Sequence, residues 1–401
     1  MIKNVDKNHT LLIKGPSRVN LLEGKVDVFG KIFTAQKAGE EPSFIIPSAA
    51  KYPIYTLESS KFEIYIADED HVEVVEENTI NNEWVRVKDI VINEIKKNQS
   101  QTPLKIMVLG ISSGKTTLIK YLANNILKEG LIGGYLDSDL GQQIIYLPTT
   151  LNIGKIGDFI ISSADINSDE TVFIGSTFPK SSFKFIVAHS CKALIDNYVK
   201  RHKDSKYILI DTDGWIKTEA GIIYKNFFID TVDPDILIIF HDDALEELKE
   251  IEQNASKSKN RKIIFLKETN KFFYEKDKEE RRFLRQSQFA KILENFRKIS
   301  IPLDDIKFIK NDYDKENDKI VEVDINVNDL INLPYHYVII SLMTEDSKLI
   351  KVGLLFVINL EKNYILLFSD LNFKEQTQVK KILLGSLRLS TKGNHQGYLY
   401  L

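Results

Sequence analysis

The segment LKIMVLGISSGKTTLIKYLANNILK, residues 104–128, constrains the fold of this chain more than any other stretch. Its first six residues are mostly apolar, its centre is rich in Gly and Ser, and its second half carries Leu118, Leu122 and Ile126 at helical spacing. A buried strand that turns sharply into a helix is the building unit of a parallel sheet covered by helices. The segment therefore predicts an α/β core that begins near Leu104.

The turn between this strand and this helix has the composition of a phosphate-binding loop. Backbone N–H groups of such a turn converge on phosphate oxygens, while the following lysine and hydroxyl contact the terminal phosphates and Mg²⁺. The usual pattern, G-x-x-x-x-G-K-[ST], has four residues between its glycines, whereas only residues 111–113 separate Gly110 from Gly114 here. We expect a working loop with a slightly different turn, and the alternative is a helix start without a ligand. The residues expected to form the loop are Gly110, Ser112, Ser113, Gly114, Lys115, Thr116 and Thr117.

Apolar strands alternate with amphipathic helices after residue 104. The expected strands are LKIMVLG, GGYLDSD, TVFIG, YILIDTDG, DILIIFH and RKIIFL, and Phe183–Lys200 has helical spacing. This alternation predicts a parallel sheet with helices on both faces. Short alternating segments before and after it, such as KFEIYIAD and HYVIISLM, predict β structure. We therefore expect an N-terminal β domain at 1–100, an α/β domain at 101–300 and a mostly β domain at 301–401.

Composition limits the classes of protein to which the chain can belong. It has 401 residues, 43% of them hydrophobic, and a single cysteine, Cys191, which excludes a disulfide framework and a thiolate metal site. No apolar run approaches the length of about 20 residues that crosses a bilayer. The Lys- and Ile-rich composition suggests a thermophilic microbe. We therefore expect a cytoplasmic protein without a membrane segment.

Charge is balanced overall but not locally. The net charge is −3, which argues against a protein that coats duplex nucleic acid without specificity. Between Ala255 and Lys298, however, fourteen Lys or Arg residues face six Asp or Glu residues. This basic segment is a candidate for holding an anionic substrate, and the alternative is a solvated charged helix.

Two aspartates, Asp137 and Asp139, follow the expected strand GGYL. Ligands of open α/β sheets lie at the carboxyl ends of the strands, so both carboxylates are expected near the bound phosphates. The alternative is a role in capping a helix. The order of the motifs favours the first interpretation, because Asp139 follows the loop lysine and precedes Gly141 and Gln142.

Six short motifs occur in the order seen in a known family. They are GISSGKTTL, YLDSDLGQ, PTT at 148–150, GSTFP at 175–179, DTDGW at 211–215 and RRFLR at 281–285. In these motifs the chain resembles the polynucleotide 5′-hydroxyl kinases related to the cleavage-factor kinase of RNA 3′-end processing and the kinase of ribosomal RNA processing. LLEGKVDVFGKIF and KKILLGSLRL extend the resemblance to both flanking domains. It implies a P-loop kinase domain between two mostly β domains.

The resemblance also implies roles for residues around the loop. Lys115 and Thr116 would hold the phosphates of ATP and Mg²⁺, and Asp139 would accept the proton of an incoming 5′-hydroxyl. Asp137 and Gln142 would support the metal and its waters. ATP, or another nucleoside triphosphate, and Mg²⁺ are therefore the expected cofactors.

The nucleic-acid end would be held by a clasp and a lid. The clasp implied by the resemblance consists of Thr212, Gly214 and Trp215, with Gln142 and Thr149 beside it. The indole of Trp215 would stack on a base, and its alternative role is that of an ordinary core tryptophan. The implied lid consists of Arg281, Arg282 and Arg285, which would offset the charge of the transferring phosphoryl group. Arg281 and Arg285 are four residues apart and would share one helix face, with Arg282 about 100° away.

We therefore expect an ATP-dependent kinase that phosphorylates the 5′-hydroxyl end of RNA, DNA or both. The alternative is a scaffold that keeps its nucleotide intact and docks RNA-processing proteins, as the shortened loop would allow. A switch GTPase is disfavoured because IIFLKETN lacks the N-K-x-D guanine motif. The expected partners are RNA or DNA with a 5′-hydroxyl end and RNA-processing proteins, with no membrane.

Overall fold

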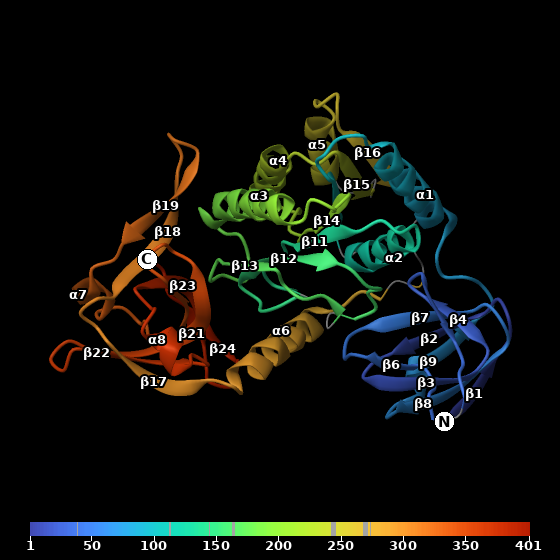
Figure 1. Ribbon diagram of the computed structural model, residues 1–401, viewed down its shortest axis with the longest axis horizontal. Coiled ribbons are helices and arrows are strands. Elements are labelled where there is room, and N and C mark those ends of the chain that lie inside the picture. The colour runs from blue at the N-terminus through green and yellow to red at the C-terminus, as the bar shows by residue number, and fades with distance from the viewer. Residues whose placement is uncertain are drawn as a thin grey trace.

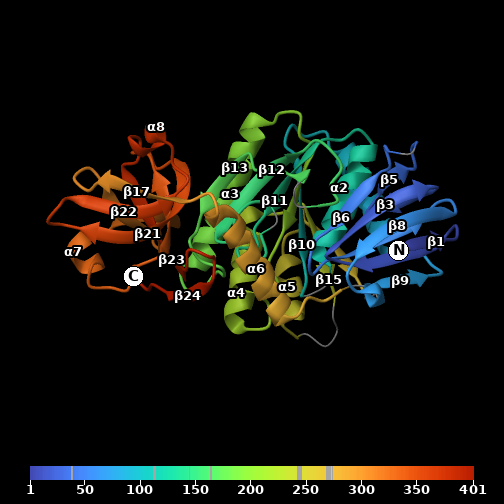
Figure 2. The same ribbon diagram turned by 90° about the horizontal axis from the view of Figure 1, so that it is seen from below.

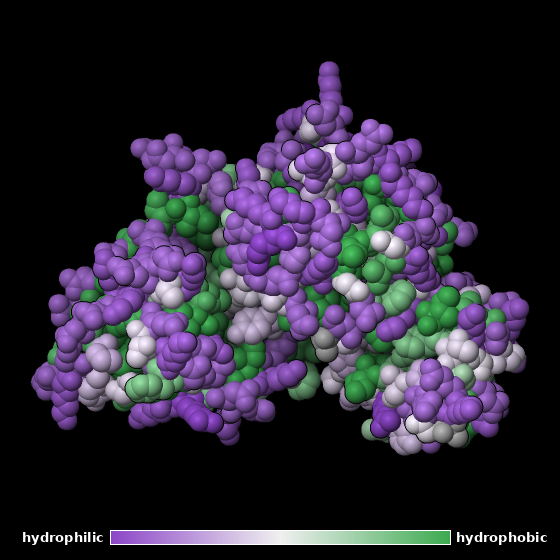
Figure 3. All heavy atoms as spheres, in the orientation of Figure 1, coloured by the Kyte–Doolittle hydropathy of each residue, from purple (hydrophilic) through white to green (hydrophobic). Residues whose placement is uncertain are grey.

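The computed structural model describes residues 1–37, 39–111, 114–143, 145–162, 165–241, 246–267, 272 and 274–401. Three parts follow one another along the longest axis, with N-terminal sheets at one end, a central sheet with helices, and a C-terminal sheet at the other end (Figures 1 and 2). Hydrophilic residues cover most of the face drawn in Figure 3, and hydrophobic residues show mainly in the hollows between the parts. No helix in the described ranges is long and apolar enough to span a bilayer.

The N-terminal part consists of two antiparallel sheets around one core, as the alternating sequence predicts. The first sheet has the order β1 (Ile2–Val5), β8 (Ser60–Ile66), β3 (Ser17–Glu23) and β6 (Ser43–Ile46). The second has the order β5 (Lys31–Thr34), β4 (Lys25–Val28), β7 (Lys51–Thr56), β2 (Thr10–Lys14) and β9 (Val72–Val75), and a short 3-10 turn, η1, spans Glu69–His71. Alternate residues such as Val19, Leu21 and Phe62 are buried between the sheets.

A helix follows these sheets where the sequence analysis expected only β structure. α1 (Asn82–Lys97) begins at Asn81, whose side chain accepts a hydrogen bond from the backbone N–H of Trp84 at 2.9 Å. Its buried residues recur every three or four positions and contact the central core: Trp84, Val87, Val91, Ile92 and Ile95. The expectation was wrong because the many Val and Ile residues resemble a strand while their spacing is helical. The division of the chain into three domains stays a prediction.

The central sheet has seven strands in the order β13, β12, β11, β14, β10, β15 and β16. Their bounds are β13 (Glu170–Phe173), β12 (Thr150–Ile156), β11 (Gly133–Asp137), β14 (Tyr207–Asp211), β10 (Leu104–Leu109), β15 (Ile236–Phe240) and β16 (Lys262–Leu266). The five strands from β11 to β16 in this order are parallel, as predicted. β12 and β13 at one edge are antiparallel, a feature that the prediction of a parallel sheet did not include. β12 follows the chain reversal after β11 directly, without the crossover helix that a parallel neighbour needs.

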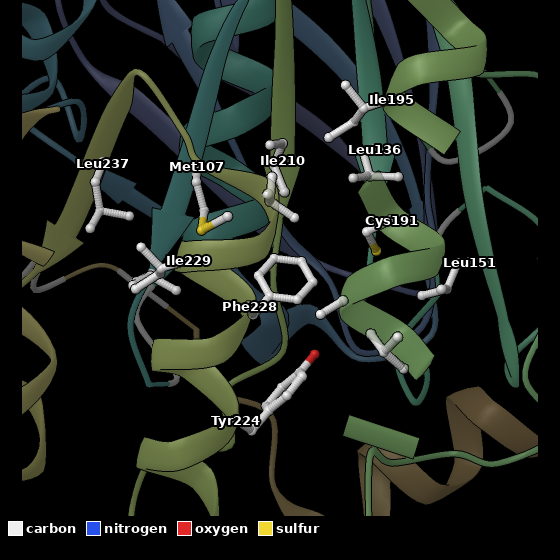
Figure 4. Packing of buried hydrophobic residues seen from close by; sticks show 14 of the residues in the cluster. Met107, Leu136, Leu151, Cys191, Ile195, Ile210, Tyr224, Phe228, Ile229 and Leu237 are labelled. Atoms are coloured by element: carbon white, nitrogen blue, oxygen red, sulfur yellow. The ribbon is translucent and has the colours of Figure 1, made fainter. Parts of the chain in front are cut away.

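Successive strand residues point to opposite faces of this sheet. Both faces are apolar, and helices cover both. Met107 and Leu109 of β10 face α3 (Phe183–Arg201), α4 (Glu219–Val232) and α5 (Glu246–Ala255). Figure 4 shows this side, where Met107, Ile210 and Phe228 lie close together. Ile106 and Val108 face α1 and α2 (Lys115–Lys128) on the other side. The sequence prediction of helices on both faces is confirmed.

The C-terminal part is built around one eight-stranded sheet with few helical residues, as predicted. Seven strands follow the order β17 (Arg297–Pro302), β22 (Tyr364–Ser369), β21 (Leu349–Asn359), β20 (Val338–Met343), β23 (Lys381–Leu389), β18 (Lys307–Asp314) and β19 (Lys319–Asp324). β24 (His395–Tyr398) pairs with β23, and α7 (Val327–Leu330) and α8 (Phe373–Gln376) are single turns. α6 (Lys278–Leu293) leads from beneath the central sheet to β17 (Figure 1).

Candidate active site

The predicted phosphate loop lies between the end of β10 and the start of α2. Gly114 precedes α2 with φ of 85°, a conformation that glycine adopts without the strain of a side chain. The Lys115 ammonium donates a hydrogen bond to the Gly110 carbonyl at 2.6 Å, so the lysine lies across the loop. Ser112 and Ser113, which were expected to bind phosphate, fall outside the described residues.

The loop after β14 closes against this phosphate loop. A Cβ placed on Gly214 would lie 3.8 Å from the Lys115 Nζ and 3.7 Å from the Gly110 oxygen. Burial lowers the pKa of Lys115, while the carboxylates of Asp211 and Asp139 act in the opposite direction. The lysine therefore lies between two acidic strand ends at the carboxyl edge of the sheet.

Asp211, which the sequence analysis left unassigned, contacts the loop directly. The Thr116 hydroxyl donates a hydrogen bond to the Asp211 Oδ2 at 2.6 Å, and the Tyr135 hydroxyl donates to the same oxygen at 3.0 Å. Asp211 is 4% exposed. A hydroxyl and a carboxylate oxygen at the phosphate loop are the donor types that Mg²⁺ takes in phosphate sites, so these residues fit that ion.

Asp139 lies at the centre of the same edge. Its Oδ1 accepts hydrogen bonds from the backbone N–H groups of Gly141 and Gln142, both at 2.9 Å. Burial raises the pKa of Asp139, and the nearby charge of Asp213 raises it further, while the two N–H donors oppose the shift. Asp137 is buried behind it and accepts a hydrogen bond from the Asp139 N–H at 3.2 Å.

The predicted lid arginines are carried by α6. Arg281 lines the cleft, and its carbonyl accepts a hydrogen bond from the Gln142 side chain at 3.2 Å. Arg285 lies near Gly141, where an added Cβ would be 3.9 Å from the Arg285 Nη1, but it is not among the residues that line the cleft. Arg282 is exposed and is not among the residues that line the cleft.

The predicted clasp residues differ in how they meet the cleft. Trp215 lines it, is half-buried, and has its ring centroid 6.0 Å from that of Tyr224, so it both packs on the core and presents a face to the cleft. Thr212 is buried, and its hydroxyl donates to the Val108 carbonyl at 2.8 Å. Thr149 is fully buried with φ of 83° and does not line the cleft. Their roles in binding nucleic acid stay predictions.

A buried ion pair lies beneath Trp215. The Lys225 ammonium of α4 lies 2.9 Å from the Asp213 Oδ2, and the Lys225 side chain has no exposed surface. The Asp213 Oδ1 accepts the backbone N–H of Trp215 at 2.8 Å, so the carboxylate also fixes the turn that carries the indole. The sequence signal for Asp213 was the DTDGW motif, whereas Lys225 has no signal because it occurs in an ordinary helix.

Lys115, Thr116, Asp139, Trp215 and Arg281 line one cleft of about 760 Å³. This volume is within the range of sites that hold nucleotide-sized ligands. The N-terminal sheets supply part of the wall through Phe29 and Tyr52. Two lysines that the sequence analysis missed, Lys120 and Lys276, also line it, and burial lowers the pKa of each, that of Lys120 to about 8. Lys120 follows the phosphate loop on α2, whereas only folding brings Lys276 to it.

Comparisons with known proteins agree with this geometry. Residues 110–295 match the family model described as the P-loop of the mRNA cleavage and polyadenylation factor CLP1. A polyribonucleotide 5′-hydroxyl-kinase of Methanocaldococcus jannaschii is 26% identical over 341 residues, which are 75% of this chain and 91% of that protein. A protein of the same name from Pyrococcus furiosus is 31% identical over 205 residues, and this match spans about half of each chain, 51% and 54%.

Solved structures share the whole architecture. The chain superposes on one from the Clp1p–Pcf11p complex with a TM-score of 0.72 at 15% identity, and the match covers 97% of each chain. It confirms a P-loop fold flanked by two β-rich regions. The matched family model spans the phosphate loop and the lid, and this chain is similar over half to three quarters of its length to proteins named polyribonucleotide 5′-hydroxyl-kinase and CLP1 homolog.

Proposed function

We propose that this chain is a cytoplasmic, ATP-dependent kinase that transfers the γ-phosphate to the 5′-hydroxyl end of RNA, DNA or both. The observation that carries the proposal is that Lys115, Asp139 and the lid residue Arg281 line one cleft. Relatives named polyribonucleotide 5′-hydroxyl-kinase support it. Phosphoryl transfer needs mainly positioning and neutralisation of charge, and these groups supply both.

Asp139 accepts the proton of the 5′-hydroxyl while the hydroxyl oxygen forms a bond to the γ-phosphorus. The bond from that phosphorus to the β–γ bridging oxygen breaks, and ADP leaves with the bonding pair. Lys115 exchanges its Gly110 partner for the terminal phosphates, while Arg281 and Arg285 offset the charge on the transferring group. Trp215 stacks on the terminal base and so holds the hydroxyl near Asp139.

Mg²⁺ would be held by Thr116 and Asp211, with Asp137 and Gln142 behind them, and it would neutralise charge on the phosphate oxygens. The hydrogen bond between Thr116 and Asp211 supports this assignment. It adds Asp211 to the residues that the sequence predicted for the metal. Binding of Mg²⁺ would replace the hydrogen bond between Thr116 and Asp211, because both oxygens would then be ligands of the ion.

A second candidate is a scaffold that keeps its nucleotide intact and docks RNA-processing proteins. The observation in its favour is the spacing of three residues between Gly110 and Gly114. Two solved structures that share this fold are of Clp1p with Pcf11p. In a scaffold the lid arginines would contact ground-state ATP alone, and phosphate transfer would be absent.

The deciding experiment incubates the protein with γ-labelled ATP and with matched RNA and DNA oligonucleotides that carry 5′-hydroxyl ends. Transfer of label to either oligonucleotide is the expected result. Lys115→Ala should abolish it, and Lys128→Ala is the matched control, because Lys128 lies at the far end of the same helix and pairs with Asp27 at 3.8 Å. Binding of ATP without any transfer would support the scaffold, and transfer by Lys115→Ala would contradict the assignment of the loop.

A further inference from the structure

A second cavity adjoins the catalytic cleft where the central sheet meets the C-terminal sheet. Its volume is about 200 Å³, and its walls come from the loop after β13, from β18 and β23, and from the segment after β24. Phe178 lines both this cavity and the catalytic cleft, so the residue lies between the two. β23 and β24 lie on the side of the C-terminal sheet that faces the central part (Figures 1 and 2).

Aromatic side chains form a series along this cavity. The ring centroids of Phe178 and Tyr398 are 6.2 Å apart, and those of Tyr398 and Tyr400 are 6.1 Å apart. Phe178 is 38% exposed and Tyr400 is 71% exposed, so these rings present surface to solvent. Exposed aromatic faces are the platforms on which single-stranded nucleic acids stack their bases.

The exposed position of Phe178 is built into its loop. The Ser176 hydroxyl donates a hydrogen bond to the Phe178 carbonyl at 2.8 Å, which closes the turn that carries the ring. The Gly175 carbonyl accepts the backbone N–H groups of Ser386 and Leu387 at 2.8 and 3.1 Å, which fixes the loop to β23. These backbone contacts hold the loop, and the Phe178 ring packs on Tyr398 across the junction while keeping part of its surface exposed.

Positive charge accompanies the aromatic series. The Lys180 ammonium lies 5.9 Å from the Tyr400 ring centroid, and Lys310 lines the cavity together with one carboxylate, Asp312. On the side toward the lid, the His395 ring lies 4.8 Å from that of Tyr398. Burial and the charges of the lid residues Arg285 and Arg282 lower the pKa of His395. Lys180 therefore lies beside Tyr400 at one end of the series, and the charges of Arg282 and Arg285 act on His395 beside Tyr398, so positive charge is available to attract a phosphate backbone.

We infer that Phe178, Tyr398 and Tyr400, with Lys180, form an extended site for the nucleotides that follow the reacting 5′ end of a single strand. The inference rests on the proposed function and extends the substrate beyond the terminal nucleotide held by Trp215. The strand leaves the catalytic cleft past Phe178 and stacks on the tyrosines, while Lys180 neutralises a phosphate. Stacking leaves the choice of base open because every base has a π-face.

The test measures kcat and KM for 5′-hydroxyl oligonucleotides of increasing length with Tyr400→Ala and Lys180→Ala. Tyr400→Ala should raise the KM of long oligonucleotides about tenfold, since one stacked base is lost, and leave kcat unchanged. The rise should vanish for a dinucleotide, which is too short to reach Tyr400. Lys180→Ala should reduce the salt dependence of KM for long oligonucleotides alone. Phe373→Ala is the matched control, because Phe373 is 83% exposed on α8, away from this cavity, and it should change nothing.

Direct binding separates this inference from the proposed function. Fluorescence anisotropy of a labelled 5′-hydroxyl oligonucleotide reports the extended site even if no phosphate is transferred. Weaker binding to Tyr400→Ala and Lys180→Ala than to the parent supports the extended site, whatever the kinase assay gives. If both variants bind and turn over long oligonucleotides as the parent does, the inference is wrong and the exposed rings serve another partner, such as a protein segment.

Discussion

Replacing Lys225 with methionine should both destabilise the protein and shift the pH dependence of its activity. The ammonium of Lys225 lies 2.9 Å from the Asp213 carboxylate, with side-chain exposures of 0% and 12%. Methionine fills a similar volume without the charge. Asp213 would then keep a buried carboxylate with its countercharge removed, next to the proposed base Asp139.

The size of the effect follows from this geometry. At 2.9 Å and an effective dielectric constant of about 20, two unit charges attract by roughly 6 kcal/mol. Loss of one partner of a buried pair typically costs about 3–5 kcal/mol, because the other charge stays buried alone. Replacing both partners with neutral groups is far less costly. The double variant Asp213→Asn with Lys225→Met should therefore recover most of the free energy of unfolding that Lys225→Met loses.

The two single variants should shift the pH dependence of kcat/KM in opposite directions, which a purely structural effect would not do. Asp139 must be ionised to accept a proton, so the rate falls as the pH drops through its pKa. The charge of Asp213 raises that pKa, and Lys225 screens the charge. Lys225→Met should therefore move the acid limb of kcat/KM to higher pH, whereas Asp213→Asn should move it to lower pH.

The assays are urea unfolding followed by circular dichroism and kcat/KM measured across pH for the parent, both single variants and the double variant. A double-mutant cycle isolates the coupling between the two side chains. Losses that simply add in the double variant would refute the buried pair as a stabilising unit. Acid limbs that move in the same direction in the two single variants would refute the electrostatic link to Asp139.

The other predictions concern groups in the cleft. In the parent, kcat/KM should fall with decreasing pH at a pH above the ordinary carboxyl range, because burial and Asp213 raise the pKa of Asp139; an acid limb near 4 would contradict this. Asp139→Asn should lower kcat by about 10²–10⁴-fold and retain ATP binding, and parental transfer would move the base elsewhere. Arg285→Ala should lower kcat by about 10³-fold in single-turnover transfer with ATP dissociation unchanged, which a scaffold would not show. Trp215→Ala should raise the oligonucleotide KM about tenfold, and an insoluble variant would instead assign Trp215 to the core.

Much of the central fold could be predicted from the sequence because its signals are local. The continuous apolar run of β10 and the helical spacing of Leu118, Leu122 and Ile126 each depend on near neighbours in the chain. The strand–loop–helix at 104–128 could be placed for the same reason. The antiparallel β12 and β13 could not, since strand direction depends on which strand lies beside which, and apolar residues alone do not encode it.

The candidate site divides in the same way. Lys115, Asp139 and the lid arginines occur in recognisable motifs, so the sequence indicated them before any fold was known. Asp211 lies within such a motif, yet its hydrogen bond to Thr116 depends on β14 lying beside β10. Lys225 reaches Asp213 only because α4 packs beneath the turn, and a lysine in a helix carries no such signal.

The flanking β regions take part in building the catalytic cleft. At its N-terminal end α6 is tied to the N-terminal sheets, where Lys14 pairs with Glu280 at 3.2 Å. Toward its C-terminal end, a Cβ on Gly393 would lie 2.9 Å from the side chain of Phe289, so the C-terminal part packs closely on the same helix. The helix that carries the lid arginines is thus held by both flanking parts. A movement of either β region relative to the central sheet would therefore shift α6 and with it Arg281 in the wall of the cleft, which ties the charge of the cleft to the arrangement of all three parts.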